Sequence, residues 1–203
     1  MCLDGAFADV VLNGDIHQQN ADRVGCTRKE VKTITYAFIY GAGDQKLGHS
    51  LNPALSDAQK KQLGAELRRK FLDAIPGLEP LIDAVKLKVR SQGRLTALDR
   101  RPVFCRAEHA ALNYLLQSAG AILSKRWVVI SQQMLDSAGL TYNIDCTRCA
   151  YVHDEQQLSV VPQEVDRVKM LLESSAPEAG RHYNFRVAIT ASADHGETWA
   201  ATH

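Results

Sequence analysis

Residues 27–41 read TRKEVKTITYAFIYG, and the interpretation of the whole chain starts from this stretch. Thr27 is a suitable N-cap, because its hydroxyl can accept a hydrogen bond from a free amide in the first turn of a helix. The helix is predicted to run from Thr27 to Tyr40. Gly41-Ala-Gly43 ends it, since glycine tolerates the backbone geometry that terminates helices.

Four side chains of this predicted helix recur every fourth residue: Arg28, Lys32, Tyr36 and Tyr40. Four residues advance an α-helix by about 400°, so each lies about 40° from the one before it and all four share one face. Two cations followed by two aromatic rings can bind a triphosphate at one end and stack on a base or sugar at the other. An amphipathic helix with a solvated basic end and buried tyrosines explains the pattern equally well.

The rest of the chain shows helical patterns first and strand patterns last. Further helices are predicted at 3–11, 57–75, 78–91 and 107–138, and another runs from Pro162 to about Glu173. Two short strand-like runs flank Asp154-Glu155 and predict a hairpin, and HYNFRVAIT at 182–190 predicts a final strand. This order favours an α+β fold over a doubly wound sheet.

The composition is that of a globular protein, since 45% of the 203 residues are hydrophobic and 23% are charged. The net charge of +1 hides an asymmetry. Residues 60–106 carry twelve Lys or Arg and five Asp or Glu, so this basic stretch could bind phosphate. Residues 150–203 carry four Lys or Arg and eight Asp or Glu, so this acidic stretch could bind a metal ion. No apolar run approaches the roughly 18 residues of a membrane helix. The N-terminus has acids where a signal peptide carries Lys or Arg, so we expect a cytoplasmic protein.

The five cysteines are odd in number and scattered, which argues against a disulfide framework. Cys146, Cys149 and His153 offer three zinc ligands at short spacing, but no second Cys or His pair completes a tetrahedral site. The same Cys-x2-Cys lacks the βαβ context of a thioredoxin-type redox site. Both chemistries are therefore discounted.

Five motifs in sequence order resemble family A DNA polymerases, the group of bacterial polymerase I and phage replicative enzymes. The motifs are NGDIH at 13–17, Arg-x3-Lys-x3-Tyr-x3-Tyr-Gly at 28–41, HAALNYLLQSAGA at 109–121, VHDE at 152–155 and TWAATH at 198–203. The resemblance implies a partial right-hand polymerase fold: helical fingers followed by a palm with a long helix and a small antiparallel sheet. Its expected parts are a palm-helix remnant at 1–15, fingers at 16–105 and palm at 106–203.

The resemblance also implies roles for the helix face at 28–40 and for the hairpin. Arg28, Lys32 and His17 would bind the incoming deoxynucleoside triphosphate, with Lys32 offsetting charge on the leaving pyrophosphate. Tyr36 would pack on the base and sugar of the nucleotide, and Tyr40 would lie near the template base. Asp154 would be a ligand of the two Mg²⁺ ions of the complete enzyme, with Glu155 beside it as a second catalytic carboxylate.

Primer-template DNA is the second partner that the resemblance implies. Arg106, Asn113, Gln117 and Ser124 are spaced seven, four and seven apart, which predicts one polar stripe along the helix at 107–138. Such a stripe can hydrogen-bond the minor groove, where every base pair presents acceptors. A helix face turned to water explains the same spacing. His153 is expected near the primer terminus.

One element of the family's pattern is not found in these residues: a palm strand with a metal-binding aspartate and a glutamate that excludes ribonucleotides. Asp4 and Asp9 do not match it. We therefore expect a C-terminal portion of a DNA-directed DNA polymerase that acts in DNA replication and is incomplete on its own. An N-terminal polymerase portion would supply this motif and the thumb, in the host cytoplasm if the protein is phage-encoded. The alternative is a non-catalytic DNA-binding remnant.

Overall fold

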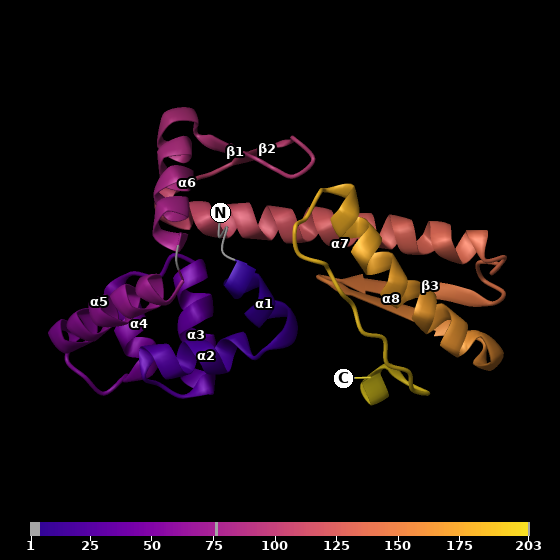
Figure 1. The fold of residues 1–203 in the computed structure, drawn as a ribbon, viewed down its shortest axis with the longest axis horizontal. Coiled ribbons are helices and arrows are strands. Elements are labelled where there is room, and N and C mark those ends of the chain that lie inside the picture. Colours follow the sequence, from indigo (N-terminus) through magenta and orange to yellow (C-terminus); the bar gives the residue numbers. More distant parts are fainter. Residues whose placement is uncertain (1–4, 76, 203) are drawn as a thin grey trace. The chain divides into compact units, whose positions relative to one another are not determined.

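A computed structural model describes residues 5–75 and 77–202. The chain divides into two compact units, and the boundary in the sequence falls between residues 116 and 117. The first unit is mainly helical (Figure 1). Its elements are α1 (Gly5–Asn13), α2 (Ile16–Val24), α3 (Arg28–Ile39), α4 (Asp44–Leu51), α5 (Asp57–Ala74), α6 (Leu78–Gln92), the antiparallel strands β1 (Arg94–Thr96) and β2 (Pro102–Phe104), a 3-10 turn at Glu108–Ala110 and the start of α7 (Ala111–Ser137).

Helix α3 begins and ends as its sequence predicts. The Thr27 hydroxyl accepts from the Glu30 amide at 3.3 Å, and the Glu30 carboxylate accepts from the Thr27 amide at 2.8 Å, which completes a capping box. Val31, Ile34 and Phe38 form its buried face. They pack in one core with residues of α2, α4 and α5, namely Ala21, Val24, Leu47, Leu67 and Phe71.

Two glycines bring α4 and α5 into close contact. A Cβ on Gly48 would lie 1.9 Å from the carbonyl oxygen of Lys60, and one on Gly64 would lie 1.7 Å from that of Asp44. No side chain, not even the methyl group of alanine, fits between the two helix backbones here, so both positions require glycine. α4 and α5 therefore pack backbone to backbone, and both contribute to the core that α3 joins.

The second unit is built from the remainder of α7 and two later elements (Figure 1). These are the hairpin of β3 (Cys146–Val152) and β4 (Glu155–Val160), followed by α8 (Val165–His182). Short 3-10 turns lie at Pro162–Glu164 and Trp199–Thr202. The strands pair antiparallel from Cys146 opposite Val160 to Val152 opposite Glu155, with a register shift between Arg148 and Ala150.

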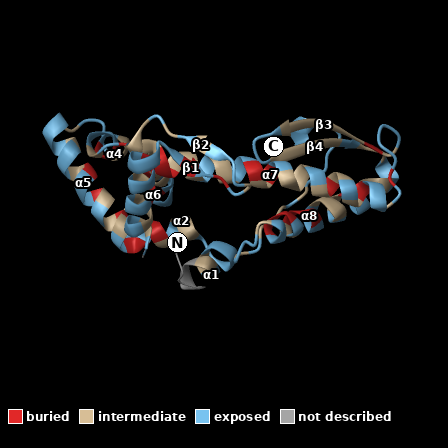
Figure 2. Ribbon diagram, turned by 90° about the horizontal axis from the view of Figure 1, so that it is seen from above, coloured by how far each residue is buried: buried red, intermediate tan, exposed pale blue. Residues whose placement is uncertain are grey.

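Helix α7 contacts both the hairpin and α8 in this unit. Leu135 of α7 shares a buried cluster with Cys146 of β3 and Val168 of α8. The indole N–H of Trp127 donates to the Ser175 hydroxyl at 2.7 Å and to the carbonyl oxygen of Leu172 at 3.1 Å. In Figure 2 the buried residues of α7 and α8 recur at intervals along largely exposed or half-buried helices.

The predicted α+β class is confirmed, as are the helices expected at 57–75, 78–91 and 107–138 and the hairpin around Asp154-Glu155. The helix expected at 3–11 corresponds to α1, although Leu3 lies outside the described residues. In the part of the chain that the structure describes, no helix is both long and apolar enough to cross a membrane.

Two predictions for the C-terminal region are wrong. The helix expected to end near Glu173 continues through Pro177 to His182, because its buried face continues with Ala176 and Ala179. The strand expected at 182–190 is not formed. The amides of Tyr183 and Phe185 instead donate to the carbonyl oxygen of Gly180, at 3.1 and 3.0 Å, in a turn that ends α8.

Candidate functional site

The four residues predicted to share a face of α3 are all exposed, on the side of the helix away from its buried residues. Arg28 and Lys32 occupy its first two turns. Tyr36 is 49% exposed and Tyr40, directly after the helix, is 56% exposed. The alternative of buried tyrosines is therefore wrong. A row of two cations and two accessible rings faces outward from a well-packed helix.

Asp15 joins this face to the start of α2. Its Oδ1 accepts from the amides of His17 and Gln18 at 3.0 and 3.1 Å, which makes it the N-cap of α2. Its Oδ2 accepts from Nε of Arg28 at 2.7 Å. This hydrogen bond from Arg28 is the main cause that lowers the pKa of Asp15. One carboxylate thus accepts from the backbone amide of His17 and from the side chain of Arg28, two residues predicted to bind the triphosphate.

Asp15 is not among the site residues predicted from the sequence, although it lies in the NGDIH segment that includes His17. The available signal was an aspartate followed three residues later by Gln18, a pattern typical of a helix start. His17 is half-buried, and its Nδ1 is buried with no hydrogen-bond partner among the described residues. The ring therefore has an unused polar atom on its inner side.

The loop that follows Tyr40 in the first unit is held by contacts with Arg68 of α5. Arg68 of α5 donates to the carbonyl oxygen of Ala42 and to the carboxylate of Asp44, both at 2.6 Å. Its guanidinium also lies 5.4 Å from the centre of the Phe38 ring, a favourable cation–π distance. A hollow of about 310 Å³ opens here, and Gly41, Phe38 and Arg68 contribute to its lining.

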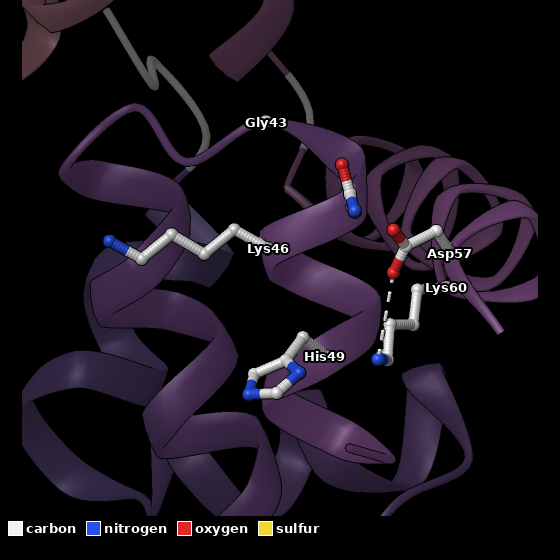
Figure 3. A pocket seen from close by; sticks show the side chains of 6 residues that line it. Gly43, Lys46, His49, Asp57 and Lys60 are labelled. Carbon is white, nitrogen blue, oxygen red and sulfur yellow. Dashed lines mark ion pairs between the residues drawn. The ribbon is translucent and has the colours of Figure 1, made fainter. Parts of the chain in front are cut away.

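A larger, shallow hollow of about 430 Å³ lies between α4 and the start of α5 (Figure 3). Lys46 and His49 project from the same side of α4, and Asp57 pairs with Lys60 at 3.8 Å. None of the residues predicted to bind nucleotide or DNA lines this hollow. The predicted site is instead the open face of α3 and the residues that Asp15 gathers.

The turn between β3 and β4 carries the predicted metal ligand in the second unit. His153 and Asp154 form this two-residue turn, and both are exposed. His153 has a φ of +54°, a left-handed conformation that is uncommon for residues other than glycine. Glu155 begins β4, and its carboxylate accepts a hydrogen bond from the side-chain amide of Gln157. Asp154 is the more accessible of the two carboxylates.

Helix α7 holds this turn through Ser124. Its hydroxyl lies 2.8 Å from the Tyr151 hydroxyl and 3.2 Å from the carbonyl oxygen of His153, and it also contacts the carbonyl of Gly120 at 2.8 Å. Ser124 is 9% exposed. The alternative of a helix face turned to water is therefore wrong for Ser124, because its hydroxyl contacts the hairpin turn.

The remaining members of the predicted stripe also differ from one another. Arg106 is exposed but precedes the helix, because Ala107 is extended and a 3-10 turn intervenes before α7 begins. Its placement on the helical stripe was wrong. Asn113 and Gln117 lie one turn apart on α7. Gln117 is exposed, whereas the side-chain oxygen of Asn113 is buried and has no hydrogen-bond partner among the described residues.

The donor set at the hairpin turn fits one oxygen-ligand position of a magnesium site. Asp154 presents an exposed carboxylate, the kind of ligand that Mg²⁺ prefers. Within residues 5–75 and 77–202, no cluster of three or more His, Cys, Asp or Glu side chains is arranged to hold a metal. Asp154 therefore offers one possible oxygen ligand, with Glu155 next to it in sequence.

The family of the chain follows from comparison with known proteins. The family model of DNA polymerase family A matches residues 3–201. The chain belongs to DNA polymerase family A. This family A chain is 34% identical over 221 residues to the DNA-directed DNA polymerase of Escherichia phage T7, and 28% identical over 181 residues to DNA polymerase I of Aquifex aeolicus.

These alignments cover 98% and 85% of the family A chain but only 30% of each relative. The chain thus spans under a third of the length of these curated relatives. A solved structure, the POL domain of Pol1 from M. smegmatis in complex with DNA primer-template and dNTP, matches with a TM-score of 0.81. The match covers 98% of this chain and 37% of that one at 22% identity. The predicted partial polymerase fold is confirmed.

Proposed function

We propose that the chain is a C-terminal portion of a DNA-directed DNA polymerase and acts in template-directed nucleotidyl transfer during DNA replication. Residues 16–105 would serve as fingers and residues 106–203 as palm, with 1–15 as part of a palm helix. The observation that carries the proposal is the exposed row of Arg28, Lys32, Tyr36 and Tyr40 in a family A chain. It offers cations for a triphosphate and rings for a base.

In this proposal, Arg28, Lys32 and His17 bind the phosphates of the incoming nucleotide. Lys32 has no carboxylate partner among the described residues, so its charge is available to the leaving pyrophosphate. Tyr36 packs on the base and sugar. Tyr40 lies beside the template base, where the loop held by Arg68 keeps the end of α3 in place.

The hairpin contributes a metal ligand and a contact to the primer. Asp154 would hold a divalent metal, with Glu155 as a second carboxylate beside it. A Mg²⁺ ion held there would supply Lewis-acid stabilisation of the negative charge that develops during nucleotidyl transfer. His153 contacts the primer terminus. Arg106, Asn113 and Gln117 contact the primer-template duplex.

The complete activity requires an N-terminal polymerase portion that supplies a second metal-binding aspartate and the thumb. The second aspartate is needed for two-metal chemistry, because Asp154 by itself cannot hold two ions in place. The location we propose is the cytoplasm, or the host cytoplasm if the protein is phage-encoded.

Primer extension tests the proposal. The 203-residue chain is assayed with Mg²⁺ and four deoxynucleotides, alone and together with a separately expressed N-terminal family A portion. We expect synthesis only in the mixture, and its loss with Asp154→Ala. Asp166→Asn, which neutralises an exposed acid in the first turn of α8, is the matched control and should retain activity. If the mixture does not extend the primer although the chain binds DNA, the result would instead favour the non-catalytic remnant.

A further inference from the structure

Asp15 and Arg28 form an ion pair that uses Nε of the guanidinium and leaves its two terminal nitrogens, Nη1 and Nη2, outside the contact. Asp15 Oδ2 contacts Nε of Arg28 at 2.7 Å, so the carboxylate approaches the guanidinium from its side. Among the described residues, no hydrogen bond involves the two terminal nitrogens of Arg28. The side chain remains 54% exposed. Together, these two nitrogens can bind a phosphate in a bidentate manner.

The other oxygen of the same carboxylate fixes the segment that carries His17. Oδ1 accepts from the amides of His17 and Gln18 and so starts α2 at a defined residue. Arg28 lies at the start of α3, thirteen residues further along the chain. One side chain therefore sets the position of two groups on separate helices.

We propose that Asp15 is a positioning residue for triphosphate binding, which orients Arg28 and the His17 segment toward the same phosphates. This inference rests on the proposed function of the α3 face. Asp15 does not touch the nucleotide itself. Its effect is to order Arg28 before binding, which removes part of the entropy cost of immobilising a long side chain.

The negative charge of Asp15 and its proposed positioning of Arg28 predict opposite effects on nucleotide binding when Asp15 is removed. A carboxylate close to a triphosphate repels it, so on charge alone the removal of Asp15 should strengthen nucleotide binding. If Asp15 orders Arg28, its removal should weaken binding although a negative charge is lost. The sign of the change therefore separates the two effects.

Asp15→Asn is the decisive variant. Asparagine is as good an N-cap as aspartate, so the start of α2 is retained. Its single side-chain oxygen is then used by the helix, and its NH₂ group cannot accept from Nε of Arg28. We expect the dissociation constant for Mg²⁺-dATP, measured by calorimetry on the full chain, to rise about three- to tenfold. Asp73→Asn removes the same charge from the exposed pair with Arg69 and should leave the constant unchanged.

A double-mutant cycle with Arg28→Ala completes the experiment. In that background Asp15→Asn should no longer weaken binding, because there is no guanidinium to position. Equal weakening in both backgrounds, no change, or tighter binding by Asp15→Asn alone would each overturn the positioning role. Failure of the unsubstituted chain to bind Mg²⁺-dATP would overturn the proposed binding of nucleotide by the α3 face, and this inference with it, whereas primer extension by the mixture tests the polymerase function separately.

Discussion

The two units fix their polar side chains in different ways. Of the nine ion pairs found among the described residues, seven lie in residues 1–116, including Arg28 with Asp15 and Arg68 with Asp44. In residues 117–203 the polar contacts that join α7 to the hairpin and to α8 come largely from hydroxyl, amide and indole groups. Ser124, Ser131 and Trp127 provide them from α7.

This difference indicates what each unit has to do. Exposed charges are weakly fixed individually, but they attract a polyanion, as the proposed role of the first unit requires. Buried hydrogen bonds between neutral groups fix geometry without a net field, which suits a turn that must present Asp154 in one place. In the second unit even Arg148 contacts uncharged oxygens: those of Gln156, Gln132 and Ser131 at 3.0, 2.9 and 3.2 Å.

The largest expected effect tests whether the charges of the first unit act on substrate. Lys32→Ala should lower nucleotide incorporation in the reconstituted mixture by about a hundredfold, because it removes a cation from the leaving pyrophosphate. Thermal unfolding should hardly change, since Lys32 is exposed. Steady-state kinetics of primer extension measure the loss.

The control for this variant is Lys61→Ala on α5. Lys61 is also an exposed lysine of the first unit, but it lies on a different helix from the row that begins at Arg28. It should keep most of the activity. Equal losses from Lys61→Ala and Lys32→Ala would mean that only the overall positive charge matters, and not the helix face.

A second prediction concerns the buried hydroxyl of Ser131 in the second unit. Its Oγ lies 2.9 Å from the carbonyl oxygen of Val128, 3.0 Å from Oε1 of Gln156 and 3.2 Å from Nη2 of Arg148, and the residue is fully buried. Ser131→Ala leaves these groups short of a partner, so we expect the free energy of unfolding to fall by about 2 kcal/mol. Chemical denaturation followed by fluorescence measures it, because both tryptophans, Trp127 and Trp199, lie in this unit.

Ser137→Ala, at the exposed end of the same helix, is the matched control and should change stability by less than about 0.5 kcal/mol. If Ser131→Ala were equally mild, the hydroxyl contacts would not be what holds the hairpin. The contrast between the units would then rest on the ion pairs of the first unit alone.

The fold was predictable from sequence where local signals and packing agree. Thr27 and the spacing of Val31, Ile34 and Phe38 specify α3 without reference to the rest of the chain. The apolar pattern of α7 is equally local. By contrast α8 continues past Pro177 because its far end packs through Ala176 and Ala179, and no local rule reports that burial.

The candidate site was predictable to a similar extent. Helical spacing places Arg28, Lys32, Tyr36 and Tyr40 on one face, and the structure confirms that they are exposed together. The link through Asp15 joins residues thirteen positions apart, and such contacts depend on how α2 meets α3. Ser124 shows the converse case, since its spacing suits a solvent-facing stripe while its hydroxyl contacts the hairpin turn.

A third prediction uses acid to distinguish the units. Among the described residues, hydrogen bonds from neighbouring side chains lower the pKa of six carboxyl groups, five in the first unit and one in the second. These are Asp15, Glu30, Glu66, Asp99 and Glu108, and Glu178. A lowered pKa in the folded state stabilises the protein above the ordinary values of 3.8 for Asp and 4.5 for Glu. That contribution is lost as the pH falls through the lowered values.

We therefore expect helices α3 and α5 to lose protection against hydrogen exchange before α8 as the pH falls below about 4.5, after correction for intrinsic exchange. Mass spectrometry of exchanged peptides from the full chain resolves the two units. Simultaneous loss in both units would show that they unfold as one cooperative body, and that their different electrostatics have no separate consequence.

The smallest expected effect concerns a single surface ion pair of the first unit. Arg69 and Asp73 of α5 approach to 3.2 Å, but their side chains are 70% and 65% exposed. Water and salt screen such a pair, and ordering two flexible side chains costs most of what attraction gains. Asp73→Asn should therefore change the free energy of unfolding by less than about 0.5 kcal/mol in urea denaturation. A loss several times larger would mean that the surface charges of this unit hold its fold, as buried hydroxyls do in the other. The charges would then be structural elements first, and the proposed attraction of a triphosphate would be a secondary property of the same side chains.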